Sequence, residues 1–215
     1  FQFLSGSSDI YNNVCEANGG GFRIKSYNAA VESSGHITIN FNGYTNIHDN
    51  RAANGGGVSV QMASSSLTEG ESSYTIQVYH DARIKDNVAT SGNGGGIYFN
   101  SSLNKNIPVT FKIFERTDNG VRHVPQITGN HAESGKGGGV YYEITESARK
   151  DIHSIFLNGG NISDNYAIYG AGVYSGGGDV NCSENVNGVS MTGNTASVDG
   201  GGLYIGSGGF LTMNS

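Results

Sequence analysis

The stretch Ile84-Lys85-Asp86-Asn87-Val88-Ala89, followed by Gly94-Gly95-Gly96-Ile97-Tyr98-Phe99, decides the fold. An apolar and two polar residues precede an asparagine, an alanine follows two positions later, and three glycines lead into an alternating apolar strand. This order recurs with a period of about 20 to 50 residues, which is typical of solenoids, propellers and arrays. The anchor asparagines of its six copies are Asn13, Asn50, Asn87, Asn130, Asn165 and Asn194, which lie 37, 37, 43, 35 and 29 positions apart.

Each repeat is expected to contain three short strands, one before the asparagine motif, one within it and one after the glycines. Ile37, Ile39 and Phe41 alternate with polar residues, which indicates a strand with one buried face. The hairpin signals of a propeller blade are missing, and glycine, at 35 of 215 residues, disfavours helices. The sequence therefore predicts an all-β fold over residues 1–215, a single right-handed parallel β-helix with three strands per rung and six to eleven rungs.

The repeated small and polar residues have expected structural roles. Each anchor asparagine is expected to take a left-handed backbone conformation and to bind backbone groups of the next rung with its side chain. The glycines allow a sharp bend, and the alanine fits where the coil interior is narrow. The residues expected to point inward after the glycines are Val58, Val60, Ile97, Phe99, Val140, Tyr142, Leu203 and Ile205.

Composition limits the partners. The net charge is -6 and the lysines and arginines are scattered, which argues against nucleic-acid binding. No stretch approaches the roughly 20 apolar residues needed to span a bilayer. Cys15 and Cys182 lie too many rungs apart to bond to each other. The chain opens and closes within a repeat, so we expect a segment of a longer extracellular or cell-surface protein, with any signal or anchor outside it.

Four tyrosines share one repeat position, directly after the first apolar residue that follows the glycines. Alternation along a strand predicts that their side chains point outward on one face of the solenoid. An outward aromatic ladder could stack on sugar rings, or it could only stabilise a flat sheet or lie under a loop. These residues are Tyr98, Tyr141, Tyr174 and Tyr204.

Other polar residues are weaker candidates for chemistry. Asp49, Asp86 and Asp164 directly precede an anchor asparagine and could do acid–base work or hold Ca²⁺. Other copies have asparagine or glycine there, which favours a turn. The histidines at 36, 48, 80, 123, 131 and 153 show no metal-site spacing, so we expect no metal, no cofactor and no catalytic set.

Two kinds of local signal lie outside the repeat. Glu115 to Pro125 is expected to form an excursion, because it lengthens one spacing and contains the turn sequence Asp118-Asn119-Gly120. Asn-x-Ser sequons at Asn100, Asn161 and Asn181 would accept glycans only in a secreted eukaryotic protein, and Asn161 is the least suitable because it lies beside a core strand.

The pairing of a Gly-Gly-x-apolar motif with an apolar-x-x-Asn motif resembles the repeats of chlamydial polymorphic outer-membrane proteins. It also resembles right-handed β-helix adhesin-like surface proteins of gut and host-associated microbes. The resemblance covers nearly the whole chain and implies a secreted passenger or a surface adhesin. The chain has Ile or Met where the chlamydial repeats favour Phe, and Gly where they often have Ala, which places it nearer to the second group.

The leading functional prediction is a non-catalytic extracellular segment, acting as an adhesin, a stalk or a structural filament component. Its partner would be a host or cell-surface glycan or protein. The alternative is a carbohydrate-active enzyme, a polysaccharide lyase or glycoside hydrolase. That reading requires carboxylates from different rungs within about 5–9.5 Å, with Asp86, Asp118 and Glu143 as the first candidates. A third possibility is end-to-end or lateral self-association through open strand edges.

Overall fold

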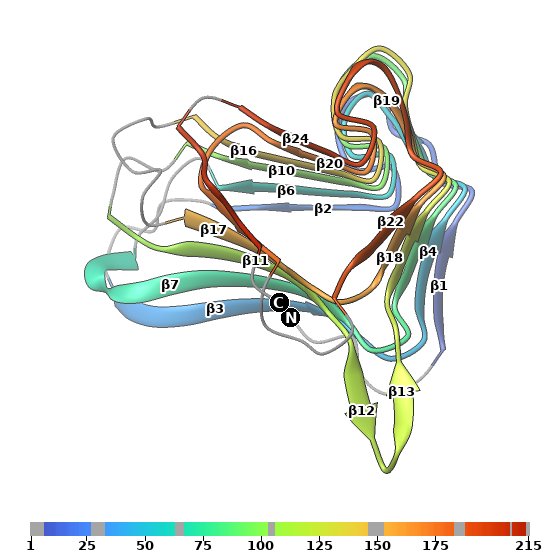
Figure 1. The fold of residues 1–215 in the computed structure, drawn as a ribbon. Coiled ribbons are helices and arrows are strands. Elements are labelled where there is room, and N and C mark those ends of the chain that lie inside the picture. Colours follow the sequence, from blue (N-terminus) through green and yellow to red (C-terminus); the bar gives the residue numbers. More distant parts are fainter. Residues whose placement is uncertain are drawn as a thin grey trace.

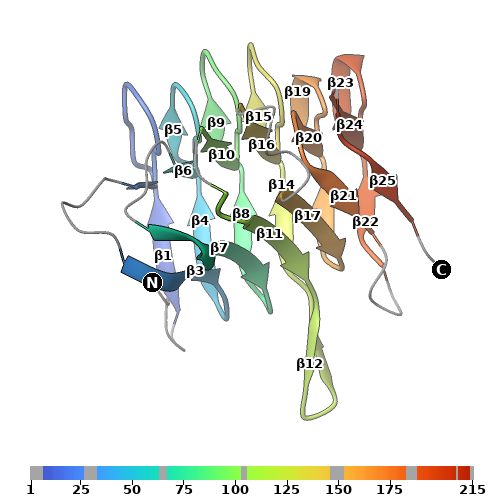
Figure 2. The same cartoon turned by 90° about the vertical axis from the view of Figure 1, so that its left-hand side faces the viewer.

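A computed structural model describes residues 7–26, 33–62, 67–102, 106–145, 153–182, 188–206 and 208–213. It shows a parallel β-solenoid in which the chain winds through stacked rungs (Figures 1 and 2). Each sequence repeat forms one rung, so the described residues form six rungs, the lower end of the predicted range. The described residues contain no helix that is long and apolar enough to cross a membrane.

Three long faces enclose the core, and each is a six-stranded parallel sheet. Sheet 1 contains β1 (Ser8–Tyr11), β4 (Thr45–His48), β8 (Arg83–Lys85), β14 (Gln126–Thr128), β18 (Asn161–Ser163) and β22 (Ser190–Thr192). Sheet 2 contains β2 (Phe22–Lys25), β6 (Val58–Met62), β10 (Ile97–Ser101), β16 (Val140–Ile144), β20 (Val173–Ser175) and β24 (Leu203–Ile205). Sheet 3 contains β3 (Ser33–Phe41), β7 (Leu67–Tyr79), β11 (Val109–Phe114), β17 (His153–Asn158), β21 (Asp179–Asn181) and β25 (Leu211–Thr212).

A fourth, short sheet lies between sheets 1 and 2, so the prediction of three strands per rung is corrected to four in most rungs. In Figure 1 it forms a loop that curls above one end of sheet 2, and we call it the arch. Its strands were not expected because several contain only two residues, too few for alternation to appear. The arch contains β5 (Arg51–Ala52), β9 (Val88–Ala89), β15 (His131–Ala132), β19 (Tyr166–Tyr169) and β23 (Thr195–Asp199).

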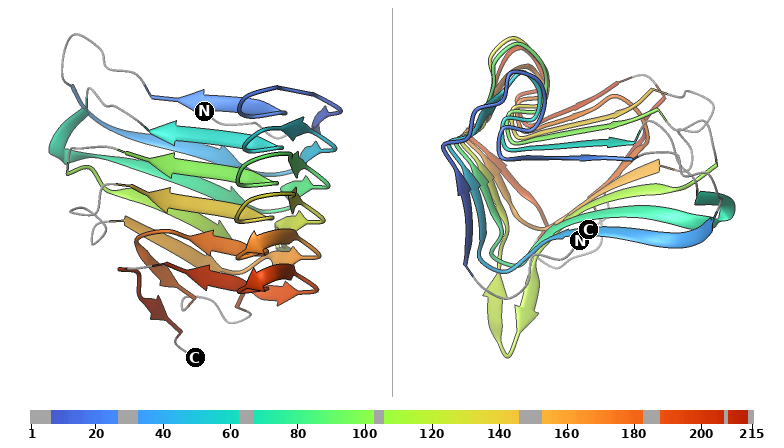
Figure 3. Two further views of the ribbon diagram at one scale, coloured as in Figure 1. Left: turned by 90° about the horizontal axis from the view of Figure 1, so that it is seen from above. Right: turned by 180° about the vertical axis from the view of Figure 1, so that it is seen from behind.

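The coil is right-handed, as predicted. Figure 3 shows the rungs stacked in chain order from blue to red, and in Figure 1 the red rungs lie nearer the viewer. In that view the chain runs leftward along sheet 2, back along sheet 3 and upward along sheet 1. An anticlockwise path that advances toward the viewer is a right-handed one.

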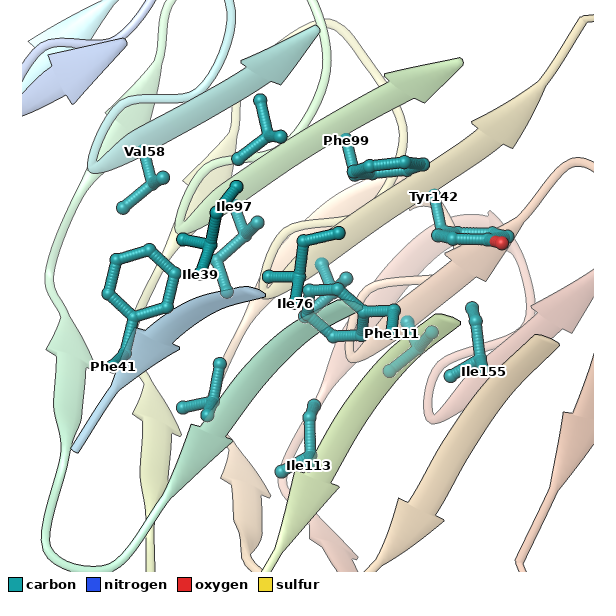
Figure 4. Close-up of a cluster of buried hydrophobic side chains, with 14 of the residues drawn as sticks. Ile39, Phe41, Val58, Ile76, Ile97, Phe99, Phe111, Ile113, Tyr142 and Ile155 are labelled. Atoms are coloured by element: carbon teal, nitrogen blue, oxygen red, sulfur yellow. The ribbon is translucent and has the colours of Figure 1, made fainter. Parts of the chain in front are cut away.

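The core consists of aliphatic and aromatic side chains stacked in register from rung to rung. Ile97 and Phe99 are fully buried, as are Val140 and Tyr142 in the next rung. Phe99 and Tyr142 stack with ring centroids 4.9 Å apart, and Phe111 packs nearby from sheet 3 (Figure 4). The prediction of inward residues is confirmed for Val58 to Tyr142, whereas Leu203 and Ile205 in the last rung are only partly buried.

The anchor asparagines form a continuous ladder of side-chain amides, which we call the amide ladder. Asn87 accepts hydrogen bonds at Oδ1 from the backbone N–H (3.1 Å) and from Nδ2 (3.0 Å) of Asn50. Its own Nδ2 donates to the carbonyl of Ile47 (2.9 Å) and to Oδ1 of Asn130 (3.0 Å). The same side-chain link joins all six anchors from Asn13 to Asn194. The side chains bind backbone groups as expected, since buried amides need partners, but these groups belong to the preceding rung and not to the next one as predicted.

The expected left-handed conformation belongs to the residue before each anchor and not to the anchor itself. Asp49, Asp86 and Asp164 have φ of 55°, 55° and 57°, and Gly129 has φ of 65° at the same position. The anchor asparagines are absent from the described residues with positive φ. The turn is made one residue earlier, and the asparagine side chain then joins the ladder. This supports a turn-forming role for these aspartates, since Asp and Gly tolerate that conformation.

The excursion predicted at Glu115 to Pro125 is confirmed as an antiparallel hairpin. It contains β12 (Arg116–Asp118) and β13 (Val121–His123), and Figure 1 shows it projecting from the corner between sheets 3 and 1. Other loop boundaries differ from the prediction. β7 begins at Leu67, so much of the loop expected over Ala63–Ser73 is strand paired with β3, and residues 63–66 lie outside the described residues. The loops expected at Ser101–Ile107 and Thr145–Asp151 lie partly outside them.

Candidate functional site

The four predicted tyrosines form one stacked column on the outer side of sheet 2, which we call the tyrosine ladder. Strand register pairs Tyr98 with Tyr141, Tyr141 with Tyr174, and Tyr174 with Tyr204. The ring centroids are 5.2, 5.3 and 5.1 Å apart along the column, and the planes differ by 8° or less. Such spacing matches the distance between neighbouring strands and favours offset stacking.

The tyrosine ladder is more covered than an outward-facing column would suggest. Tyr141 and Tyr174 are each only 7% exposed. The arch contributes to this cover, since Lys136 places its Nζ 4.6 Å from the Tyr174 ring centroid and donates to the Tyr174 hydroxyl at 3.1 Å. Tyr169 of the arch meets the edge of Tyr204. Strand alternation showed the side of the sheet correctly, but not that the glycine bend folds a loop back over it.

This geometry limits what the tyrosine ladder can bind. Each inner ring has neighbouring rings on both faces, so the faces needed to stack on a sugar are occupied by other tyrosines. The polar groups beside the rings remain. The Tyr141 hydroxyl donates to Oε2 of Glu143 (3.2 Å), Tyr98 hydrogen-bonds to Gln61, and Lys136 binds Tyr174. The surface therefore resembles a polar strip more than an aromatic platform.

Burial also changes the acidity of these hydroxyls. Burial raises the pKa of Tyr98, of Tyr142 in the core and of Tyr141, and the Glu143 carboxylate raises the pKa of Tyr141 further. For Lys136, the hydrogen bond to Tyr174 raises the pKa of the ammonium group.

Alkaline pH is therefore expected to destabilise the protein. A tyrosine in the unfolded chain loses its proton near its ordinary pKa of 10.0, whereas these folded tyrosines resist ionisation. Their stabilising contribution is complete below that pH and is lost as pH rises above it toward the folded pKa values. In a pH titration, exposed tyrosines can form tyrosinate in the folded protein, but the last part of the tyrosinate absorbance should appear together with the loss of β-sheet circular dichroism. Completion of the tyrosinate absorbance before the circular dichroism changes would contradict the burial of these rings. Tyr141→Phe combined with Tyr142→Phe should reduce the pH dependence.

The carboxylates considered for the enzymatic alternative lie on three different parts of the solenoid. Asp86 is at the turn after β8, where its Oδ1 lies over Gly129. Asp118 is in the hairpin and pairs with Arg116 at 2.8 Å, and Glu143 is on β16 beside Tyr141. Figure 1 shows the hairpin and β16 on opposite sides of the core. No contact among the described residues joins two of these three carboxylates.

A cluster that the sequence did not predict lies at the corner from which the hairpin projects, and we call it the corner cluster. It contains His80 and Asp81 from the turn between β7 and β8, and His123 from the end of β13. His123 Nδ1 lies 2.6 Å from Asp81 Oδ2, and the two imidazole rings stack with centroids 3.6 Å apart. His123 is 43 residues from His80, so no local spacing could have revealed the pair. An excursion that begins at the same corner was the only available signal.

An open groove of about 410 Å³ runs beside the corner cluster along the outer side of sheet 1. Its lining is polar, and Tyr44 is 61% exposed. Asn46 donates to Oδ1 of Asp9 at 2.8 Å within this lining. The groove is lined by Ser7, Asp9, Tyr44, Asn46, Asp81 and Arg83.

The sequons and cysteines have ordinary surroundings. Asn100, Asn161 and Asn181 lie within β10, β18 and β21 and are half-buried, and the Asn161 Oδ1 atom is buried without a hydrogen bond to any described residue. Cys15 and Cys182 are both free, as predicted, and burial raises the pKa of the Cys182 thiol.

No family model, no curated protein and no solved structure matches this chain.

Proposed function

We propose that this chain is a rigid, non-catalytic segment of an extracellular surface protein, acting as an adhesin or as its stalk. The observation that carries the proposal is the continuity of the amide and tyrosine ladders. Asparagine occupies the same place in all six rungs, and its side chain bonds to both neighbouring rungs wherever two exist. Bonding that is repeated in every rung is suited to a rigid spacer or a display surface. A catalytic site would instead depend on a few residues that break the repeat.

The bonding pattern supports rigidity. Every described rung is hydrogen-bonded to its neighbours through parallel sheets on three faces, and the last five rungs are also joined through the arch. Six rungs spaced about 4.8 Å apart give a rod roughly 25–30 Å long. A bend would have to break several of these ladders together. The resemblance to microbial adhesin-like repeats supports an extracellular location, where a compact coil resists proteases.

The partner we favour is a cell-surface glycan, recognised by the polar strip along the tyrosine ladder. Hydroxyl, carboxylate, amide and ammonium groups alternate there, at Tyr141, Glu143, Gln61 and Lys136. Planar and charged groups of this kind hydrogen-bond to sugar hydroxyls. A protein partner, or another copy of the chain at an open strand edge, would use the same rod in a different way.

A glycan-array screen of the 215-residue chain tests this proposal. We expect binding that falls at least about tenfold when Tyr98, Tyr141 and Tyr174 are all changed to Phe. That change keeps the stacked rings and removes only their hydroxyl groups. Tyr44→Phe is the matched control, because Tyr44 is exposed outside the tyrosine ladder.

Three further results would decide against all or part of the proposal. Equal binding by the triple variant would remove the tyrosine ladder as the recognition surface. Cleavage of a bound glycan, seen as new reducing ends or unsaturated uronic acids, would favour the polysaccharide-cleaving alternative over an adhesin. If the parent chain bound no glycan on the array, the proposed glycan partner would be rejected and only the proposed spacer role would remain.

A further inference from the structure

The corner cluster contains a histidine in an unfavourable backbone conformation. His80 has φ of 61°, which is left-handed and uncommon for a residue with a side chain. Strand register on both sides makes Gly43 its equivalent in the preceding rung, and Gly43 has φ of 59°. This turn has the same conformation in both rungs, and glycine supplies it without strain. A histidine there costs backbone energy, and such outliers point to a functional constraint.

The hairpin is inserted at the same corner of the following rung. Phe114 pairs with Tyr79 and Gln126 pairs with Arg83, so the extra residues lie directly beside the turn that carries His80 and Asp81. The return strand β13 ends at His123 and sets its ring against that of His80. Two separate departures from the repeat, a histidine in place of glycine and a hairpin, therefore meet at one point.

The three side chains direct their ligand atoms toward a common centre. One oxygen of Asp81 lies 2.6 Å from Nδ1 of His123 and 3.5 Å from Nδ1 of His80. All three ligand atoms lie within 4.8 Å of one another. The His80 Nδ1 atom is buried and makes no hydrogen bond in the described part of the chain, although it lies beside Asp81. A buried ring nitrogen without a hydrogen bond is rare and needs an explanation.

We propose that His80, Asp81 and His123 bind a divalent transition-metal ion, with Zn²⁺ as the best fit. Zinc accepts imidazole nitrogen and carboxylate oxygen at about 2.0–2.2 Å in tetrahedral sites. Ligands of such a site lie roughly 3.3 Å apart, which is close to the His80–Asp81 separation of 3.5 Å. Two nitrogen ligands disfavour Ca²⁺ and Mg²⁺, which prefer oxygen.

Binding requires a small rearrangement of the side chains. The hydrogen-bonded contact between His123 and Asp81 must lengthen, and the two stacked rings must tilt so that each lone pair points at the ion. The backbone need not move, because the turn and the end of β13 already bring the three residues together. The fourth position is open to water from the side of the groove, which Asp81 also lines.

Asp118 is suited to position one of the ligands. Its Oδ2 lies 3.4 Å from Nε2 of His80, the nitrogen that would not bind the ion. Arg116 holds the same carboxylate at 2.8 Å through Oδ1. A carboxylate beside the second ring nitrogen orients a ligating histidine and increases its basicity. Asp118 is therefore a positioning residue, and the hairpin supplies both it and His123.

The bound ion would fasten the hairpin to the rung beneath it. β12 and β13 pair only with each other among the described strands, so the hairpin makes no sheet bond to the solenoid. A metal joining His123 to His80 and Asp81 would fix its base. Val121, which is 57% exposed in the hairpin, would then be presented in a constant orientation.

Isothermal titration of the EDTA-treated 215-residue chain with ZnCl₂ tests the site. We expect one saturable site, and Co²⁺ should give the intense visible absorption of a tetrahedral complex. His123→Asn and His80→Asn should each weaken binding by roughly 100-fold, and Asp118→Asn by about 10-fold or more. Asparagine is chosen at position 80 because it tolerates the left-handed backbone. His131→Asn, at an exposed position in the arch, should leave binding unchanged.

The site is refuted if the parent chain shows no saturable Zn²⁺ binding up to about 1 mM, a limit set by the weakest useful metal affinities. It is also refuted if the His80 and His123 variants bind as tightly as the parent. Circular dichroism on each variant establishes that the solenoid is folded. Added Zn²⁺ should also slow proteolysis within the hairpin in the parent chain but not in His123→Asn.

Discussion

Changing Asn87 to alanine is expected to lower the free energy of unfolding by about 2–6 kcal/mol. The side chain is fully buried in the amide ladder. Without it, the backbone N–H of Asn50 and the carbonyl of Ile47 lose the amide partners they have in the folded state. Each buried polar group left without a partner costs roughly 1–3 kcal/mol. Water cannot replace the amide easily, because the site lies inside the stack of rungs.

Urea denaturation measured by circular dichroism would give this value, and Asn13→Ala is the matched control. Asn13 occupies the same repeat position but is exposed in the first described rung. Its side chain only donates to Asn50 and Tyr11. We expect a loss below about 1 kcal/mol there. If both variants lost the same free energy of unfolding, burial within the amide ladder would not be the source of the stability that the central asparagines provide.

Changing Gly96 to alanine is the second large effect, with an expected loss of about 3 kcal/mol. A Cβ atom at this position would lie 2.7 Å from the carbonyl oxygen of Gly139 and 3.0 Å from Cγ of Asn130. The first is backbone of the next rung, and the second belongs to the amide ladder. Neither can move aside without disturbing a further rung, so the added methyl group must strain the stack.

Gly202 provides the comparison, because it occupies the same place as Gly96. Each is the last glycine of its triplet, Gly94–Gly96 in the third repeat and Gly200–Gly202 in the sixth. A Cβ atom there would first meet Met191 at 3.7 Å, which is ordinary contact, and its φ is not left-handed. Gly202→Ala should change stability by less than about 1 kcal/mol, because only the unfolded chain is affected appreciably. Thermal unfolding of the pair, recorded under one buffer condition, measures the difference. Similar melting temperatures would mean that the rungs are not packed as closely as described.

Much of the fold could be predicted because the repeat places the same chemistry at the same point of each turn. The anchor asparagines indicated that the repeats stack in register, since a buried amide in one rung has its natural partner in the next, but they left the number of rungs between six and eleven. The arch was missed because strands as short as Arg51–Ala52 show no alternation. The left-handed residue was placed one position too late, since both Asp86 and Asn87 tolerate that conformation.

The candidate sites were harder to predict than the fold. Alternation assigns Tyr174 to the outer side of its sheet, but it contains no information about Lys136, which covers the Tyr174 ring and donates to its hydroxyl. The corner cluster depends on His123 returning through the hairpin to His80, and only the path of the chain in space shows this. Sequence periodicity predicts only the features that repeat. The histidine at position 80 and the inserted hairpin each occur once, so the period does not predict them.

The coincidence of one sequence repeat with one rung also bears on how such a gene can change length. Duplication or loss of a whole period would add or remove one complete turn and leave every remaining asparagine facing another asparagine. Changes of other lengths can be accommodated only at the corners, as in the 43-residue spacing that contains the hairpin. Recombination between repeats would therefore alter the reach of the protein in steps of about 4.8 Å, with no new interface to be evolved.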